Sequence, residues 1–451
     1  MDNPLAKRRA GVLLHVTSLP SGRLDDEALR WLDFMESAGL SVWQVLPLVI
    51  PDSHGSPYQS ESAFAMDPRL LPVNAADVDD ADVEEFCAAN PWLDDFALFR
   101  VLKRQHDNRP WTDWPVAHRE RDADALAAVQ RKEDAEIRKI RRQQFTLTRA
   151  WSRIHRHARD RGIFLFGDIP IFVAHDSAET WAQPDNFLLD ADGNPTYVTG
   201  VPPDYFSATG QRWGNPHYRW DRMQADGFQW WHARMQHQFN LFDIVRIDHF
   251  RGLAAVWMIE SQCETAIEGF WEDTPGDALL AALQQRHEPL PIVAEDLGVI
   301  TDDVKQLRLK YGLPGMTVLQ FAFDHFEDNP HKPTNIRPDD VVYTGTHDND
   351  TCEGWFQKLE PHERDFVFET LDVPPTDDIA ELMIETAMQT QANLAMMPLQ
   401  DLLGLDSQAR MNTPGVTEGN WRWRFQWEIF PTDLAARLLE KVDATGRRHA
   451  S

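Results

Sequence analysis

Cysteine is scarce in this chain of 451 residues, which contains only three. Cys87, Cys263 and Cys352 lie far apart and lack the close spacing of metal-binding or redox motifs. This pattern excludes a disulfide framework and is typical of isolated thiols in a reducing compartment. We therefore expect a cytoplasmic protein, and we expect it to need neither a metal nor a cofactor.

Basic residues are also few, with 44 lysines and arginines against 72 aspartates and glutamates, for a formal charge of −28. Neutralising phosphates requires a basic surface, so this balance argues against a nucleic-acid partner, and it also disfavours an anionic membrane surface. No apolar run approaches the ~18 residues that span a bilayer. The apolar stretch that follows Arg9 ends at His15, too early for a secretory signal. The oligomeric state stays open.

What the chain does contain is a series of short apolar runs, each ending in a polar or small residue. The candidate strands are Gly11–Val16, Ser41–Leu46, Ile163–Asp168, Asp243–Asp248, Ile292–Asp296, Thr317–Phe323, Val341–Thr346 and Leu394–Leu399. Continuous apolar runs are typical of strands buried on both faces. Helix-like stretches lie between them, such as Glu27–Ala38, Thr301–Tyr311 and Asp377–Thr390. We predict an α/β fold, a (β/α)8 TIM barrel; a doubly wound sheet would show a similar pattern, but no Gly-rich phosphate turn supports it.

Two gaps between these runs are too long for simple crossovers and predict insertions after strands two and three. Residues 49–160 include the interleaved charges of Arg119–Gln144, which predict a largely helical subdomain. Residues 170–242 are rich in Pro, Gly, Asp and Asn, which predicts an irregular, loop-rich insertion that covers the cleft. Residues 1–451 would then form a single catalytic barrel domain that carries both insertions.

Carboxylates at the ends of the predicted strands mark the candidate active site, because barrel enzymes use the C-terminal ends of their strands. Asp168, Asp248, Glu295 and Asp348 end strands three, four, five and seven. A retaining glycosidase needs a nucleophilic carboxylate and a proton-donating carboxylic acid about 5–5.5 Å apart. Asp248 and Glu295 come from adjacent strands and suit this pair, with the shorter Asp attacking and the longer Glu protonating the leaving oxygen.

The residues around these carboxylates fit the same hypothesis. Arg246 lies two positions before Asp248, on the same side of the strand, where a cation would hold Asp248 ionised. Asp348 would stabilise an oxocarbenium-like transition state, and His347 would bind sugar hydroxyls. Two alternatives stay open: a metal-dependent hydrolase with His249, His347 and Asp348 as ligands, and a purely structural role for solvated strand ends.

Tryptophan is unusually frequent, with 17 residues against 6 tyrosines, and its flat ring suits either a protein core or a sugar. Candidates for substrate contact lie beyond predicted strand ends or in loops: Trp181, Trp213, Trp257, Trp355, Tyr58, Tyr205 and Phe206. Others lie on helix-like segments, where we expect them to pack in the core: Trp31, Trp151, Trp230 and Trp231.

Long and unusual motifs recur along nearly the whole chain. They are Gly11–His15, Thr17–Ser21, Ser56–Gln59, Gly167–Pro170, Gly200–Gln211, Trp213–Pro216, Arg246–Phe250, Ala294–Gly298, Leu313–Met316, Thr346–Asp350, Met411–Gly415 and Glu418–Trp421. With these motifs the chain resembles glycoside hydrolase family 77, the 4-α-glucanotransferases known as amylomaltases or disproportionating enzymes.

The resemblance implies an interrupted barrel, a double-displacement mechanism and α-1,4-glucan substrates. In it Asp248 would be the nucleophile, Glu295 the general acid/base and Asp348 the stabiliser of the transition state. The implied substrate-binding residues are Tyr58, Arg246, His347 and Trp213, together with Asp204, Tyr205, Phe206 and Gln211 from a mobile loop at Gly200–Gln211.

We therefore predict a 4-α-glucanotransferase of maltodextrin, starch or glycogen metabolism. It would move α-1,4-glucan segments to the 4-hydroxyl of glucose or a maltooligosaccharide, with retention, through a covalent glycosyl-enzyme. One alternative is an α-1,4-glucan hydrolase of the same clan. The other is a non-catalytic glucan-binding protein on a decayed barrel, which would have lost a carboxylate, whereas all three are present in this chain.

Overall fold

The computed structural model describes residues 4–75, 77–204 and 207–448, and within these ranges eight parallel strands form the central sheet. Along the chain they are β1 (Arg9–Leu13), β2 (Val42–Gln44), β3 (Phe164–Pro170), β6 (Ile244–Asp248), β9 (Ile292–Ala294), β10 (Gly315–Val318), β11 (Asp340–Tyr343) and β12 (Leu394–Pro398). Their order is β10-β11-β12-β1-β2-β3-β6-β9. The sheet closes between β9 and β10, where the Ala294 amide donates to the Pro314 carbonyl over 2.8 Å. The predicted (β/α)8 barrel is confirmed, and each predicted strand overlaps one of these eight.

The side chains inside the barrel change character along the strand direction. Alternate residues of a strand point to the same side, so Phe166 and Asp168 of β3 both face inward, as do Ile244 and Arg246 of β6. Parallel pairing places Phe166 beside Ile244 and Asp168 beside Arg246. The first pair belongs to an apolar cluster contributed by the barrel strands, whereas the second pair is polar and buried. The interior is thus apolar at the N-terminal end and charged at the C-terminal end.

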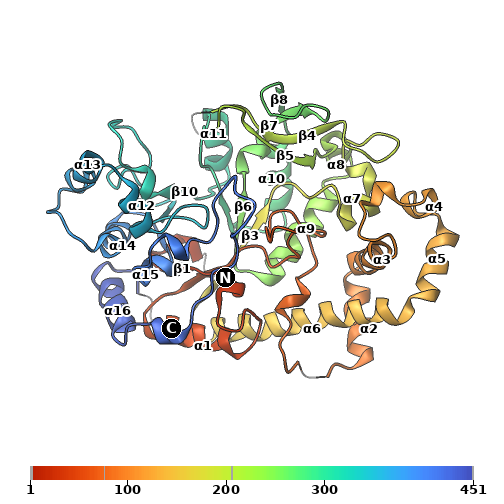
Figure 1. The fold of residues 1–451 in the computed structure, drawn as a ribbon, viewed down its shortest axis with the longest axis horizontal. Helices are drawn as coiled ribbons and strands as arrows, with labels where there is room; N and C mark the ends of the chain where they lie inside the picture. Colours follow the sequence, from red (N-terminus) through yellow and green to blue (C-terminus); the bar gives the residue numbers. More distant parts are fainter. Residues whose placement is uncertain (1–3, 76, 205–206, 449–451) are drawn as a thin grey trace.

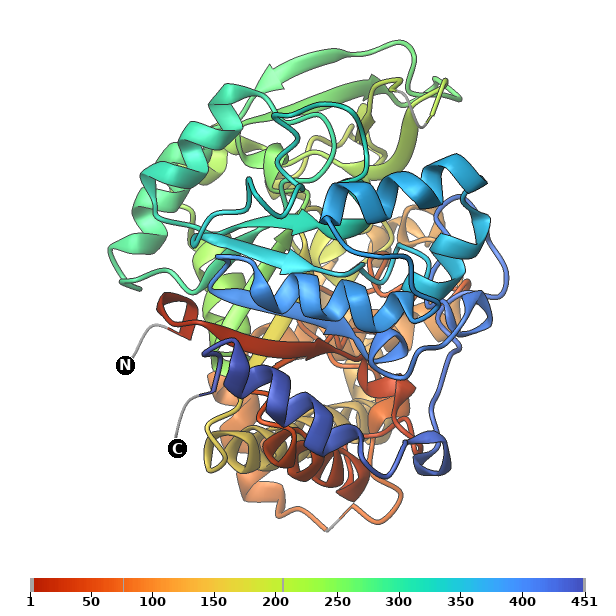
Figure 2. The ribbon, with the colours of Figure 1, turned by 90° about the vertical axis from the view of Figure 1, so that its left-hand side faces the viewer.

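Helices surround the barrel (Figure 1). They include α1 (Asp26–Ser37), α10 (Gly276–Gln284), α11 (Asp302–Lys310), α12 (Cys352–Lys358), α13 (Pro361–Leu371), α14 (Ile379–Gln389), α15 (Leu399–Leu402) and α16 (Leu434–Ala444). The two ends of the described chain lie close together (Figure 2), and the buried guanidinium of Arg447 donates to the Arg9 carbonyl over 2.9 Å. No helix formed by the described residues combines the length and the apolar character needed to cross a bilayer.

The first insertion is helical, and its helices lie to one side of the barrel in Figure 1. Its helices are α2 (Asp80–Ala89), α3 (Trp92–Gln105), α4 (Val116–Arg119), α5 (Ala123–Lys132) and α6 (Asp134–Arg159). A separate apolar cluster, which includes Phe96, Phe99 and Trp111, holds α3 against its neighbours. The charged segment Arg119–Gln144 begins at the end of α4 and is divided at Glu133 between α5 and α6.

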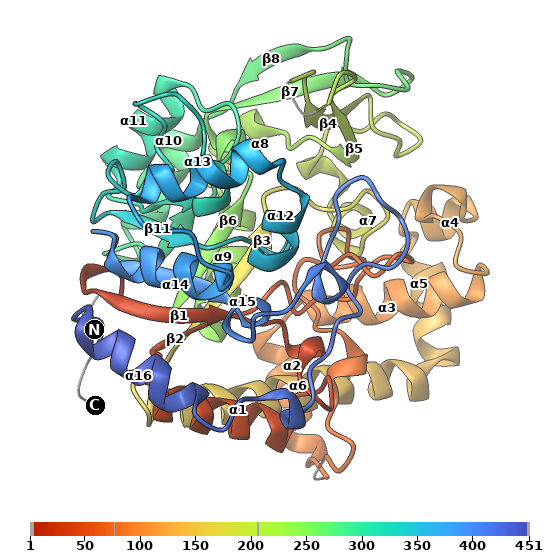
Figure 3. The same ribbon diagram turned by 60° about the vertical axis from the view of Figure 1, so that its left-hand side comes forward.

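The second insertion contains more regular structure than its sequence indicated. It holds α7 (Ala178–Ala182), β4 (Tyr197–Val201), β5 (Gln211–Pro216), α8 (Trp220–Ala225) and α9 (Gln229–Leu241). The strands β4 and β5 join β7 (Ala255–Glu260) and β8 (Phe270–Asp273) in an antiparallel sheet of order β5-β4-β7-β8. This sheet lies at the top of Figure 3, above the barrel strands. The helix α9 leads directly into β6 and is therefore part of the barrel rather than of a loop.

Candidate active site

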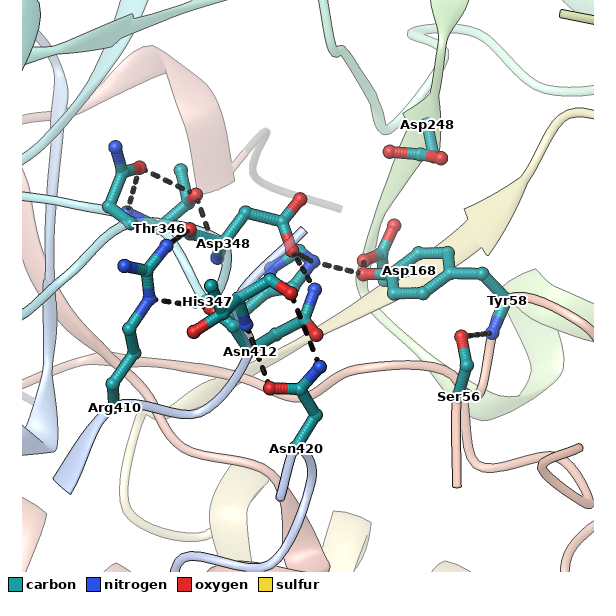
Figure 4. Close-up of polar contacts among 12 residues, drawn as sticks. Ser56, Tyr58, Asp168, Asp248, Thr346, His347, Asp348, Arg410, Asn412 and Asn420 are labelled. Carbon is teal, nitrogen blue, oxygen red and sulfur yellow. Dashed lines mark hydrogen bonds and ion pairs between the residues drawn. The ribbon is translucent and has the colours of Figure 1, made fainter. Parts of the chain in front are cut away.

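The structure gathers the predicted carboxylates at one end of the barrel. Asp168 lies on β3 and Asp248 is the last residue of β6. Glu295 follows β9 directly, and Asp348 lies in the loop between β11 and α12. Because parallel strands end on the same side of a barrel, four separate chain segments deliver their acids to one mouth. Figure 4 shows Asp168, Asp248 and Asp348 around Tyr58 and His347.

Arg246 is the cation at the centre of this group. Its Nε donates to Oδ1 of Asp168 and its Nη2 to Oδ2, both over 2.8 Å, and Nη2 also lies 2.9 Å from Oδ1 of Asp248. The side chains of Arg246 and Asp168 are 4% and 0% exposed. A bidentate, buried pair of this kind fixes the guanidinium in place. Arg246 therefore contacts Asp248, and it shares its charge with Asp168.

Tyr58 and His347 form a second layer against this ion pair. The Tyr58 hydroxyl donates to Oδ2 of Asp168 over 2.7 Å and lies 2.9 Å from Nε2 of His347. The two rings stack, with centroids 5.3 Å apart and planes 12° apart. Burial and the nearby Arg246 lower the pKa of His347, which keeps its imidazole neutral. His347 is thus a neutral hydrogen-bonding group in this site.

Glu295 is held by backbone amides. Its Oε2 accepts from the His249 amide over 2.7 Å, and its Oε1 accepts from the Leu297 amide over 3.0 Å. His249 has a φ of 55°, in the left-handed region that residues other than glycine rarely adopt. The chain turns sharply here, and the N–H that follows Asp248 points at Glu295. The Glu295 carboxylate therefore connects the end of β9 to the end of β6.

The electrostatics of Asp248 and Glu295 favour the retention of a proton on this pair of carboxyls. Burial raises the pKa of Asp248, the charges of Glu295, Asp168 and Asp348 raise it further, and Arg246 opposes the shift. Burial also raises the pKa of Glu295, against the effects of Arg246 and of the two amides. Two carboxyls that interact strongly lose their protons in two separate steps.

Asp348 is more exposed than the other acids, at 49% of its side chain. Its Oδ1 accepts from Nδ2 of Asn412 over 2.6 Å and lies 3.4 Å from Nε2 of His347. Arg410 donates to the Asp348 carbonyl over 2.5 Å and, through Nε, to the Asn412 carbonyl over 2.7 Å. The segment after β12 thus fixes the Asp348 loop (Figure 4).

The other predicted substrate-binding residues lie on the antiparallel sheet and its connecting loop. The ring of Trp213 packs edge-on against His249, with centroids 4.7 Å apart, which places Trp213 beside the end of β6. Its Nε1 donates to Oε1 of Gln211 over 3.1 Å. Asp204 lies in a turn, where its Oδ1 accepts from the Ser207 amide over 2.7 Å. The predictions for Tyr205 and Phe206 lie outside the described residues.

The structure also shows which tryptophans pack in the core and which pack elsewhere. The predicted core tryptophans are buried: Trp31, Trp151, Trp230 and Trp231. Trp181, a candidate for substrate contact, is buried on α7 instead, where its ring lies 5.7 Å from that of Trp114. Trp257 pairs with Trp271 in the antiparallel sheet, and Trp355 packs on Phe323.

Three residues of the site have no role assigned from the sequence. The sequence marks Asp168 as a strand-end carboxylate, but its pairing with Arg246 depends on the register of β3 against β6. Asn412 lies in the Met411–Gly415 motif and Trp421 ends the Glu418–Trp421 motif. The sequence assigns no function to either residue. The Trp421 ring lies 6.1 Å from that of Tyr58 and 5.9 Å from that of His347.

Replacing Asp168 with Asn should destabilise the fold by about 3 kcal/mol, because it removes one partner of a buried ion pair and leaves Arg246 undercompensated. Urea unfolding with an unchanged m-value would measure this difference in the free energy of unfolding. The control is Asp134→Asn, whose partner Arg138 lies on an exposed helix face, so its loss should leave stability unchanged. Equal unfolding midpoints for both variants would contradict the assignment of Asp168 to this buried pair.

A closed parallel barrel with several acids at the C-terminal ends of its strands is the architecture of the (β/α)8 enzymes that work with paired carboxylates. Among the described residues, no group of three or more His, Cys, Asp or Glu side chains is placed to hold a metal ion.

Comparison with known proteins narrows this class to one family. The sequence profile of the family described as 4-alpha-glucanotransferase matches residues 14–80 and 73–430. The 4-alpha-glucanotransferase of Thermus thermophilus is 42% identical, covering 98% of this chain and 99% of its own, and that of Synechocystis is 40% identical with the same coverage. An amylomaltase from Streptococcus agalactiae, solved with acarbose, is 32% identical with a TM-score of 0.94, covering 98% of this chain and 100% of the solved one. The chain belongs to glycoside hydrolase family 77, the family of the 4-α-glucanotransferases.

Proposed function

We propose that this protein is a 4-α-glucanotransferase (EC 2.4.1.25), which moves α-1,4-glucan segments from a donor to the 4-hydroxyl of glucose or a maltooligosaccharide. The single observation that carries the proposal is the arrangement of Asp248 beside Arg246, with Glu295 anchored to the amide that follows Asp248. Asp248 and Glu295 thus stand at the ends of adjacent strands at one barrel mouth, which supports a nucleophile and a proton donor that act together. Membership of the family supplies the substrate class.

The first step in this proposal is attack by Asp248 on the anomeric carbon of the donor. As the carboxylate forms the new C–O bond, the glycosidic C–O bond breaks, and Glu295 gives its proton to the departing 4-oxygen. This requires Asp248 to be ionised and Glu295 to be protonated. Asp248 contacts the Arg246 guanidinium directly at 2.9 Å, so we place the retained proton of the pair on Glu295.

The second step reverses the first with a different sugar. Glu295, now a carboxylate, accepts the proton of the acceptor 4-hydroxyl while the acceptor oxygen attacks the same anomeric carbon and Asp248 leaves. Each displacement inverts the centre, so the α-configuration is restored. The two amides that hold Glu295 suit this part of the cycle, because they stabilise its ionised form.

The remaining residues bind and stabilise the donor sugar. Asp348 lies where its negative charge acts on Asp248, so it also acts on positive charge that develops at the neighbouring sugar ring. The neutral His347, held by Tyr58, offers a hydrogen bond to sugar hydroxyls. Trp213 beside His249 gives a flat face at the edge of the cleft. The loop Gly200–Gln211 would cover the bound glucan.

Incubation of the pure protein with maltotriose tests transfer against its main alternative, hydrolysis. Transfer should give glucose together with maltopentaose and other longer oligomers from the first minutes, because release of glucose leaves a maltosyl group that the acceptor maltotriose takes up. The alternative hydrolase would give glucose and maltose without longer products, and that result would overturn the proposal. A non-catalytic binding protein would leave maltotriose intact while still binding it.

A further inference from the structure

A second concavity lies beside the catalytic centre and has a volume of about 620 Å³. Four stretches line it: the turn after β1, the loop that leads to Tyr58, the segment around Arg69 and the segment of residues 420–424. None of the four acids of the site lines it. Trp421 lies between the two sites, because it lines this concavity and its ring also lies near Tyr58 and His347.

Four arginines surround this concavity, which we call the arginine pocket: Arg23, Arg69, Arg422 and Arg424. Two of them alternate with tryptophans in the segment of residues 421–424. Trp421 and Trp423 are half-buried and pack against an apolar cluster with Met411, whereas Arg422 and Arg424 are exposed. The packing of Trp421 and Trp423 thus anchors this segment, and Arg422 and Arg424 line the concavity.

Neutral groups, rather than carboxylates, position Arg23 and Arg424. Arg23 donates through Nη1 to the carbonyl of Leu71 over 2.7 Å. Arg424 donates through Nε to the carbonyl of Thr17 over 3.1 Å and lies against Gly22, where an added Cβ would be 2.3 Å from Nη2. In the described ranges, no carboxylate lies within ion-pair distance of Arg23, Arg424 or the third cation, Arg422.

The charge of the pocket is therefore positive, in a chain whose formal charge is −28. Two carboxylates line it, and one of them, Asp67, is paired with Arg69 at 2.7 Å. The other, Asp52, accepts two amides of its own turn. His15 adds no charge, because burial and the nearby His347 lower its pKa to about 3. Four guanidinium groups thus face two carboxylates.

We propose that the arginine pocket binds the phosphate group of a phosphorylated sugar or glucan. Guanidinium groups hold phosphate oxygens through paired, charge-assisted hydrogen bonds, and such groups already stand here with unused donors. The ring of Trp421 offers an adjacent flat face for a sugar. A chain with its phosphate in the pocket would cross Trp421 and reach Tyr58 and His347. The glucan part of this inference rests on the proposed function, whereas the phosphate part does not.

Titration calorimetry on the full chain tests this inference at low ionic strength with three ligands: inorganic phosphate, a maltooligosaccharide, and the same maltooligosaccharide bearing one phosphate monoester. The phosphorylated sugar should bind more tightly than either part alone. The double variant Arg422→Gln, Arg424→Gln should weaken phosphate binding about tenfold or more, the equivalent of 1.4 kcal/mol. Its transfer activity on maltotriose should remain unchanged, because neither arginine contacts the catalytic acids.

The matched control is Arg131→Gln, Arg138→Gln, which removes the same charge from exposed positions on α5 and α6. It should keep full affinity for phosphate. Equal losses in the two double variants would show general attraction to positive charge and would overturn the inference, as would an absence of phosphate binding. Equal affinities for inorganic phosphate and the phosphorylated sugar would overturn its sugar part. If maltotriose is not a substrate but Arg422 and Arg424 still govern phosphate binding, the proposed function fails and the phosphate site stands.

Discussion

Replacing Asp248 with Asn is expected to reduce transfer from maltotriose by about 10⁴-fold or more, because the covalent step loses its nucleophile. Asn keeps the size of the side chain, and its amide still accepts a hydrogen bond from Arg246, so the barrel should remain folded. Initial rates of glucose release measure the loss. The control is Asp221→Asn, since this aspartate is 77% exposed and lies away from the strand ends.

A small anion should restore part of the activity when the nucleophile is removed altogether. In Asp248→Ala, azide can enter the space of the missing carboxylate and attack the anomeric carbon from the same face. Inversion of the α-linked donor then gives a β-glycosyl azide. An Asp248→Ala variant that transfers glucan at the wild-type rate without azide would contradict the assignment of Asp248 as nucleophile.

Replacing Glu295 with Gln is expected to have the second-largest effect, and this effect should depend on the leaving group. Transfer from maltotriose should fall by about 10²–10⁴-fold, since the departing 4-oxygen is no longer protonated. With α-maltosyl fluoride the first step should fall far less, because fluoride leaves without a proton. Equal losses for the two donors would contradict the role of Glu295 as the acid. Glu84→Gln, at an exposed position of α2, should behave as the wild type with both donors.

The pH dependence of kcat/KM gives an independent test of the same residue. Activity needs Glu295 protonated, so the rate should fall as the pH rises through its pKa, and burial moves that pKa above the usual range of glutamate. The high-pH limb should therefore be present in the wild type and absent in Glu295→Gln. A Gln variant with an unchanged high-pH limb would show that another group is responsible.

The barrel was predictable because its strands are buried on both faces and therefore read as continuous apolar runs. The catalytic candidates followed from position alone, because Asp248 and Glu295 stand at the ends of such runs. The second insertion was less predictable for the opposite reason. Its helix α7 is only five residues long, and its strands join a sheet whose edge strand β8 is exposed. Neither the helix nor the strands therefore show a clear hydrophobic period.

Contacts between distant segments were the part that sequence reasoning did not reach. The pairing of Asp168 with Arg246 requires the register of two strands, and no local pattern encodes that register. Asn412 reaches Asp348 from a segment 64 residues later in the chain. The burial of Trp181 likewise depends on α3 and its neighbours, which pack against α7 from the first insertion.

The most direct test of the central claim is to trap the covalent intermediate on this chain. The Glu295→Gln variant should react with α-maltotriosyl fluoride to form the glycosyl-enzyme and then release it slowly, because the acceptor has lost its base. Mass spectrometry of the intact protein and of its peptides should show a gain of one maltotriosyl group on the peptide that contains Asp248. Turnover of the fluoride without any such gain, or a gain on a peptide that lacks Asp248, would contradict a double displacement at this residue.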